Sequence, residues 1–194
     1  MTEPWPYKRI PWLTYGAIGF IEAHIEKDWS VFEWGSGGST LYFLDKGVKW
    51  LTTIEHDWSW MIKLPIIGAV CISLKHIPPE PAGLGINPCY PEDYYSSDIE
   101  FKSHKFEKYA KAIDDFKDES LQLVLVDGRA RPSCVKHAIP KVAKGGYLVL
   151  DNSERLHYFI AQGLLKEPDW KIYRFAGHGP YSDTEWETTI YQKR

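Results

Sequence analysis

The chain has 194 residues, of which 44% are hydrophobic and 25% are charged, so it is long enough for one well-buried domain and short for two. Its formal net charge of −3 gives no general basic field, which disfavours binding to nucleic acid through bulk electrostatics. The three cysteines form no CxxC pair and argue against a disulfide framework or a structural zinc site. With no signal-peptide core and no membrane-length apolar run, we expect a cytoplasmic protein.

The first quarter of the chain predicts an N-terminal extension followed by a strand and a helix. Residues 1–13 are rich in proline and aromatic residues and predict an irregular arm, and apolar spacing over residues 14–28 predicts a helix. We expect residues 1–30 to pack on a single domain that spans residues 1–194. Residues 31–34 predict a strand, and the glycine turn after them leads into a helix over residues 41–45 that Gly47 ends.

The remaining elements alternate between strands and helices. Strands are predicted over residues 48–54, 69–74, 121–126, 147–150, 170–175 and 188–192, and helices over residues 59–64, 106–116, 132–143 and 154–165. The proline-rich segment 77–103 and the segment 177–184 are predicted loops, and we expect them to cover a binding site together. The alternation predicts an α/β fold, a parallel sheet with helices on both faces and a closing hairpin.

Ligands of such open sheets bind beyond the carboxyl ends of the strands. That rule brings four features of this sequence to one edge. They are the glycine turn, Glu55, Asp127 with Arg129, and Asp151 with Asn152.

The stretch VFEWGSGGST, residues 31–40, places an acid before a glycine turn and a helix start, an arrangement that suits the polar or anionic part of a small molecule. No lysine follows the glycines, which excludes a phosphate-binding P-loop. A dinucleotide fingerprint is met in part by Gly35, Gly37 and Glu55, but Thr40 stands where the third glycine belongs.

The same stretch resembles the first motif of class I S-adenosylmethionine-dependent methyltransferases, an acid followed by a Gly-x-Gly turn, with Ser39 in place of a further glycine. The resemblance continues over most of the chain through Glu55, LVLVDGRAR and KGGYLVLDNSER. It implies a Rossmann-like, mostly parallel seven-stranded sheet with helices on both faces and a C-terminal antiparallel hairpin. The cofactor contacts that it implies are Glu33 to the methionine ammonium, Glu55 to the ribose hydroxyls, and Gly35, Ser36, Gly37, His56 and Asp127.

The two strand ends that carry Asp127, Asp151 and Asn152 also resemble the divalent-metal site of catechol-type O-methyltransferases. The resemblance implies a magnesium-type site at these three residues, although Ala130 and two arginines replace the lysine of those enzymes. Arg129 and Arg131 either pair with these carboxylates or face an anionic acceptor. The residues expected at the acceptor are Asp127, Arg129, Asp151 and His178, with Tyr181 beside them.

The sequence therefore predicts a methyltransferase that acts on a small-molecule or glycan-type acceptor, at oxygen. It predicts no nucleic-acid partner and no membrane contact, and it leaves the acceptor and the oligomeric state open. Two alternatives remain. They are an NAD(P)-dependent oxidoreductase and a non-catalytic protein that keeps the fold for cofactor or partner binding.

Overall fold

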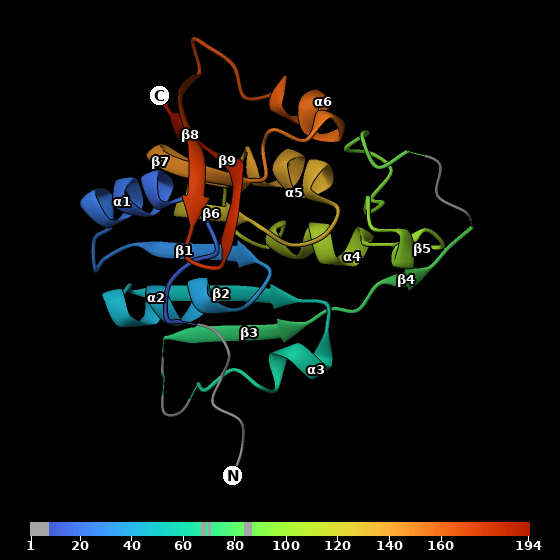
Figure 1. The fold of residues 1–194 in the computed structure, drawn as a ribbon, viewed down its shortest axis with the longest axis horizontal. Coiled ribbons are helices and arrows are strands. Elements are labelled where there is room, and N and C mark those ends of the chain that lie inside the picture. Colours follow the sequence, from blue (N-terminus) through green and yellow to red (C-terminus); the bar gives the residue numbers. More distant parts are fainter. Residues whose placement is uncertain (1–7, 67–68, 70, 84–86) are drawn as a thin grey trace.

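The structure of this chain is a computed structural model that describes residues 8–66, 69, 71–83 and 87–194. Its described residues form a seven-stranded sheet in the order β3-β2-β1-β6-β7-β9-β8 (Figure 1). The first five strands of this order are parallel, whereas β9 runs antiparallel to both β7 and β8. The strands are β1 Ser30–Trp34, β2 Trp50–Glu55, β3 Ile72–His76, β6 Leu121–Val126, β7 Val142–Asp151, β8 Trp170–Gly179 and β9 Ser182–Lys193.

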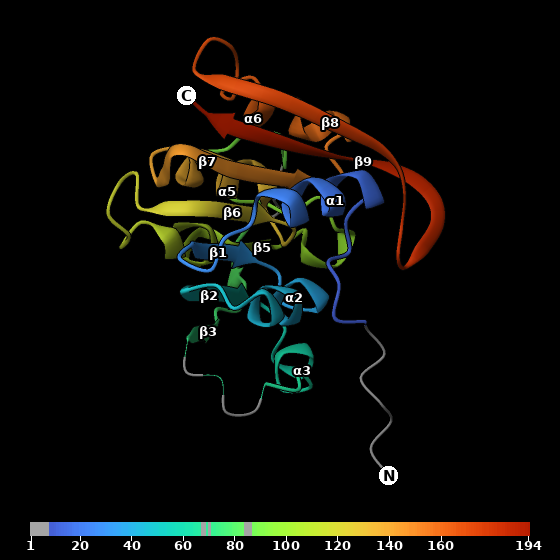
Figure 2. The same ribbon diagram turned by 90° about the vertical axis from the view of Figure 1, so that its left-hand side faces the viewer.

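Helices cover both faces of the sheet (Figure 2). The α-helices are α1 Tyr15–His24, α2 Gly38–Lys46, α3 Trp58–Met61, α4 Glu107–Ala110, α5 Arg131–Ala138 and α6 Phe159–Gln162. Short 3-10 turns lie at η1 Ile99–Phe101, η2 Lys111–Ile113 and η3 Leu156–Tyr158, and a small antiparallel pair joins β4 Glu80–Pro81 to β5 His104–Lys105. This architecture confirms the predicted fold class. None of the helices formed by the described residues combines the length and apolar character that a membrane span needs.

Alternation along β1 divides the core into two layers. Phe32 and Trp34 pack with residues of α4, α5 and α6, whereas Val31 packs with residues of α1 and α2. Glu33 follows Val31 on the second of these faces, where its carboxylate meets the start of α2. Glu33, the acid within this apolar strand, therefore lies beneath the glycine turn.

Several predicted elements have other bounds in the structure, and the differences include two helices and one loop after β6. The helix expected over residues 132–143 ends at Ala138, because Pro140 has no N–H to continue it and Val142 already begins β7. The helix expected over residues 154–165 is only η3 and α6. The loop expected over residues 177–184 is mostly strand, since β8 continues to Gly179 and β9 begins at Ser182.

The N-terminal arm lies on the domain as far as the structure describes it. The Tyr181 hydroxyl contacts the backbone oxygens of Lys8 and Ile10 at 2.6 and 3.0 Å. A Cβ at Gly38 would lie 2.2 Å from the oxygen of Ile10, so the arm passes directly over the start of α2. Residues 1–7 of the predicted arm lie outside the described part of the chain, as do residue 70 of the predicted third strand and residues 84–86 of the predicted long loop. Residues 67–68, before that strand, also lie outside the described part.

Candidate functional site

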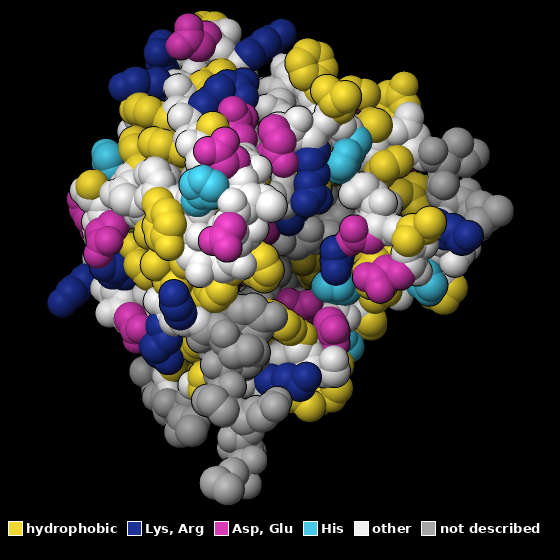
Figure 3. Space-filling model, viewed as in Figure 1, with side chains coloured by type: hydrophobic (Ala, Val, Ile, Leu, Met, Phe, Trp, Pro, Cys, Tyr) yellow, Lys and Arg dark blue, Asp and Glu magenta, His cyan; other side chains and the backbone are white. Residues whose placement is uncertain are grey.

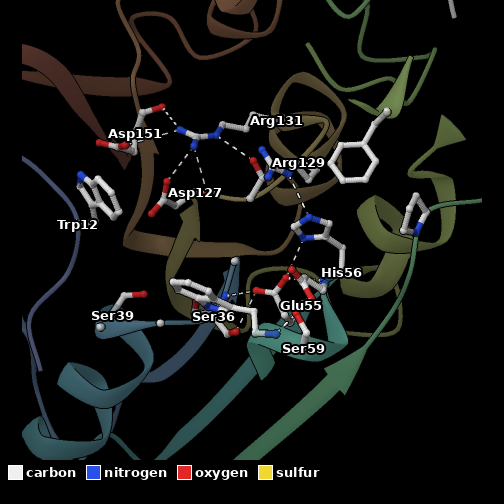
Figure 4. Close-up of a pocket in the computed structure, with 18 of the residues that line it drawn as sticks. Trp12, Ser36, Ser39, Glu55, His56, Ser59, Asp127, Arg129, Arg131 and Asp151 are labelled. Atoms are coloured by element: carbon white, nitrogen blue, oxygen red, sulfur yellow. Dashed lines mark hydrogen bonds and ion pairs between the residues drawn. The ribbon is translucent and has the colours of Figure 1, made fainter. Parts of the chain in front are cut away.

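A cavity of about 800 Å3 opens at the carboxyl ends of β1, β2, β6 and β7 (Figure 4). The glycine turn, Glu55, Asp127 with Arg129, and Asp151 with Asn152 all line it, which confirms the predicted convergence. The other lining residues are Trp12, Gly38, Ser39, His56, Asp57, Trp58, Ser59, Trp60, Pro79, Glu100, Phe101, Gly128, Arg131 and Tyr181.

The first glycine of the turn is required by its surroundings. Gly35 has a φ of +93°, and a Cβ there would lie 3.0 Å from the backbone oxygen of Asp127. The turn therefore brings the ends of β1 and β6 into contact. The Gly37 N–H donates to the Thr40 hydroxyl at 2.9 Å, which fixes the backbone at the entrance to α2.

Glu33 lies beneath this turn and does not line the cavity. Its carboxylate accepts hydrogen bonds from the hydroxyls of Ser39 (2.7 Å), Thr40 (2.5 Å) and Thr53 (2.7 Å). Burial raises the pKa of Glu33 to about 7, although the three hydroxyls act in the opposite direction. The direct contact between Glu33 and a bound ammonium that the motif implied is therefore wrong for this conformation, because Ser39 stands between the carboxylate and the cavity.

Glu55 ends β2 and faces the cavity as predicted. Its Oε2 accepts from the backbone N–H and the hydroxyl of Ser36, both at 2.9 Å, and its Oε1 accepts from the N–H of Asp57 at 2.8 Å. Burial alone would raise the pKa of Glu55, but hydrogen bonds from His56, Asp57 and Ser36 lower it below the usual value. An ionised acceptor carboxylate is thus held at the wall of the cavity.

Arg129 is held at the cavity wall by residues of the long loop. Its guanidinium pairs with Asp98, lies 3.7 Å from Glu100 and sits over the Phe101 ring at 5.3 Å. Its Nε donates to Nε2 of His56 at 3.1 Å. Arginine has no acceptor atom, so Nε2 of His56 accepts in this bond, and Nδ1 of the same ring lies 2.7 Å from Oε1 of Glu55.

Arg131 occupies the position at which the sequence predicted a metal (Figure 4). Its guanidinium donates to Oδ1 of Asp127 at 2.9 Å, to the backbone oxygen of Asp151 at 2.5 Å and to Oδ1 of Asn152 at 3.3 Å. It also donates to the backbone oxygen of Gly128 at 3.0 Å.

A fixed cation therefore already occupies one oxygen of each of the three residues at which the sequence predicted a divalent ion. No group of His, Cys, Asp and Glu side chains with metal-binding geometry occurs among the described residues. The predicted metal site at Asp127, Asp151 and Asn152 stays a prediction, and in this structure one oxygen of each of these residues accepts from the guanidinium of Arg131. The sequence left open whether Arg131 pairs with the carboxylates or faces an anionic acceptor, and in the structure it pairs with Asp127.

The carboxylates of Asp127 and Asp151, which lie around Arg131, differ in whether an oxygen is left without a hydrogen-bond donor. Oδ1 of Asp151 accepts from Nε1 of Trp186 (2.9 Å) and the hydroxyl of Thr188 (2.7 Å), and the residue is 3% exposed. Within the described part of the chain, no donor contacts Oδ2 of Asp127, whose side chain is 23% exposed. Burial raises the pKa of Asp127, with Arg131 acting against it and Asp151 adding to it. Asp127 is thus the acceptor-side carboxylate with an oxygen available.

The aromatic wall comes from two segments far apart in the sequence. Trp12 and Tyr181 line the cavity with ring centroids 5.2 Å apart. Tyr181 was expected at the site, whereas nothing in the sequence distinguished Trp12 from the other tryptophans. His178 was also expected there, but it does not line the cavity and instead lies 3.4 Å from Glu185 on the hairpin. His178 lies where the pairing of β8 with β9 shifts its register, between Gly177 and Gly179, and its side chain is directed to Glu185 instead of the cavity.

No protein-family model matches this sequence, and no curated protein matches it. Solved structures do match over most of the chain. A methyltransferase-like protein from Silicibacter pomeroyi is 20% identical with a TM-score of 0.57, covering 96% of this chain and 90% of its own. An rRNA methylase from Streptococcus thermophilus is 11% identical with a TM-score of 0.57, covering 92% and 95%.

A proposed methyltransferase from Streptococcus mutans, solved in complex with SAH, is 11% identical with a TM-score of 0.56, covering 89% of this chain and 93% of its own. The class I methyltransferase fold expected from the motifs is therefore confirmed.

Proposed function

We propose that this protein is an S-adenosylmethionine-dependent methyltransferase. The observation that carries the proposal is the meeting of the glycine turn, Glu55 and Asp127 in one cavity, at the edge of the sheet where this fold binds ligands. Glu55 is held as an ionised acceptor and would take the ribose hydroxyls, exchanging its bonds to Ser36 for them. Gly35 and Gly37 would let the backbone approach the methionine end.

The charge of the cavity favours this cofactor over a nicotinamide dinucleotide. Five carboxylates line the cavity against two guanidinium groups, and both guanidinium groups are already paired. The carboxylates are Glu55, Asp57, Glu100, Asp127 and Asp151. Acidic side chains, in magenta, also lie around the hollow on the face that Figure 3 shows. Such a surface suits a cationic sulfonium and opposes a diphosphate. The start of α2, where a pyrophosphate would bind, is also covered by the backbone of Lys8 and Ile10.

The chain supplies alignment and a base for methyl transfer. S-adenosylmethionine, when bound, offers an electrophilic methyl group. Asp127 lines the cavity with an oxygen that Arg131 leaves free, so its ionised form would accept the proton that an acceptor hydroxyl loses as its oxygen attacks. Arg131 holds Asp127 in place through Oδ1, and Trp12 and Tyr181 would contact the acceptor's apolar part.

The acceptor that we propose is a small molecule or a sugar, methylated at oxygen. The rRNA methylase among the structural neighbours raises a nucleic-acid acceptor as the alternative. The net charge of −3 and the acidic cavity oppose a polyanion, since phosphate binding needs clustered cations. A single domain over residues 1–194 and a cytoplasmic location stay predictions. Cys71, Cys89 and Cys134 are free thiols in the structure.

Isothermal calorimetry with S-adenosylhomocysteine and with NAD(H) and NADP(H) tests the proposal. We expect only S-adenosylhomocysteine to bind. Glu55→Ala should weaken its binding by about 1 to 3 kcal/mol through the lost ribose bonds, whereas Glu80→Ala, outside the cavity, should leave it unchanged. Binding of a nicotinamide nucleotide alone would favour the oxidoreductase. Binding of S-adenosylhomocysteine without methyl transfer to any small-molecule, glycan or RNA panel would favour the non-catalytic alternative.

A further inference from the structure

Ser39 connects the buried acid to the cavity. Its side chain lines the cavity beside the glycine turn (Figure 4), although the residue is only 5% exposed. Its hydroxyl lies 2.7 Å from Oε2 of Glu33. The hydroxyl of Ser39 is the donor in this bond, as the hydroxyls of Thr40 and Thr53 are in theirs, so both oxygens of Glu33 act as acceptors.

The direction of this bond decides what Ser39 can offer to a ligand. A hydroxyl has one proton and two lone pairs, and the proton of Ser39 is committed to Glu33. Toward the cavity it therefore presents lone pairs alone, polarised by the negative charge behind them. A ligand atom at Ser39 must then be a donor, and a charged donor forms the stronger bond.

We propose that Ser39 is a positioning residue that accepts a hydrogen bond from the ammonium group of the cofactor's methionine end, and that Glu33 supplies the negative charge through it. The inference rests on the proposed function and replaces the direct contact from Glu33 that the sequence motif implied. The buried acid acts on the ligand without leaving its site.

The other two hydroxyls on Glu33 are not available for this role. Thr40 donates to Glu33 and accepts from the N–H of Gly37, so it belongs to the turn. Thr53 donates to Oε1 of Glu33 from β2 and does not line the cavity. Thr53 therefore offers a matched control, because its removal costs Glu33 one hydrogen bond and leaves the wall of the cavity intact.

The test compares two ligands on three proteins by isothermal calorimetry. The ligands are S-adenosylhomocysteine and its desamino analogue, in which hydrogen replaces the amino group. The wild-type protein should bind S-adenosylhomocysteine about 10- to 100-fold more tightly, as expected for a hydrogen bond to a charged group. In Ser39→Ala the preference should fall to within about 3-fold, whereas Thr53→Val should keep most of it.

Three results would overturn the proposal. They are equal binding of the two ligands by the wild-type protein, an undiminished preference in Ser39→Ala, and an equal loss in Thr53→Val. The first needs no variant, so it holds even if Ser39→Ala does not fold. If the wild-type protein binds neither ligand, the proposed function itself fails. If it binds both equally, the cofactor stands and the role of Ser39 falls.

Discussion

Nη2 of Arg131 lies 2.9 Å from Oδ1 of Asp127, and this pair stands at the junction of β6, β7 and α5. The side chain of Arg131 is 10% exposed, and its guanidinium also donates to the backbone oxygens of Gly128 and Asp151. We therefore expect Arg131 to stabilise the fold and to oppose the binding of a metal ion at these oxygens.

Replacing Arg131 by Ala should destabilise the fold by about 3 to 5 kcal/mol, because it leaves buried carboxylates without their counter-charge. Urea denaturation at pH 7 measures the change. Arg9→Ala is the matched control, since its ion pair with Asp45 is about half exposed and should contribute no more than about 1 kcal/mol. Equal losses in the two variants would contradict a structural role for the buried pair.

Titration of the wild-type protein with Mn2+ or Mg2+ should show no stoichiometric binding. Oδ1 of Asp127, the backbone oxygen of Asp151 and Oδ1 of Asn152 accept from Arg131, and a divalent ion would have to displace this bonded guanidinium. Calorimetry in chelator-treated buffer provides the measurement. A saturable site that disappears in Asp127→Asn would restore the metal that the sequence predicted.

Stability should fall as the pH rises from about 4.5 to 7. The pKa of Glu33 is about 7 in the fold against a usual 4.5, so the folded state holds the proton more tightly. This contribution is fully present below pH 4.5, is lost through pH 7, and amounts to about 3 kcal/mol. Asp127 and Asp151 act in the same direction.

Comparison with Glu33→Gln therefore isolates the contribution of Glu33. Urea denaturation at several pH values should give a steeper fall for the wild-type protein than for this variant. Parallel curves would show that the carboxyl of Glu33 does not titrate in this range.

Gly38→Ala should displace the N-terminal arm from α2, because its Cβ would lie 2.2 Å from the backbone oxygen of Ile10. We expect faster hydrogen exchange over residues 8–13 and a loss of stability. Gly19→Ala in α1 is the control, since nothing lies within 4 Å of its Cβ, and alanine in a helix should add about 0.5 to 1 kcal/mol. Unchanged exchange in Gly38→Ala would mean that the arm does not rest on α2.

The order of the main strands and helices, and the edge of the sheet at which the cavity opens, could be predicted from the sequence alone. Periodicity carries the first, since the apolar run over residues 121–126 matches β6 residue for residue. The second follows from where polar residues end strands, as Glu55 and Asp151 do. Both are local properties of the chain.

The hydrogen-bond partner of each polar group at the site, in contrast, depends on contacts that form when the chain folds. Glu33 is buried beneath the cavity because hydroxyls from α2 and β2 surround its carboxylate. Arg131 lies where the sequence predicted a metal because α5 begins beside the end of β7. Trp12 lines the cavity because the N-terminal arm crosses α2. The side chain of His178 lies outside the cavity, against Glu185. Hydrogen bonds and ion pairs act over a few ångströms, and here they join residues that are distant in sequence. The spacing of residues along the chain therefore does not predict which of them pair.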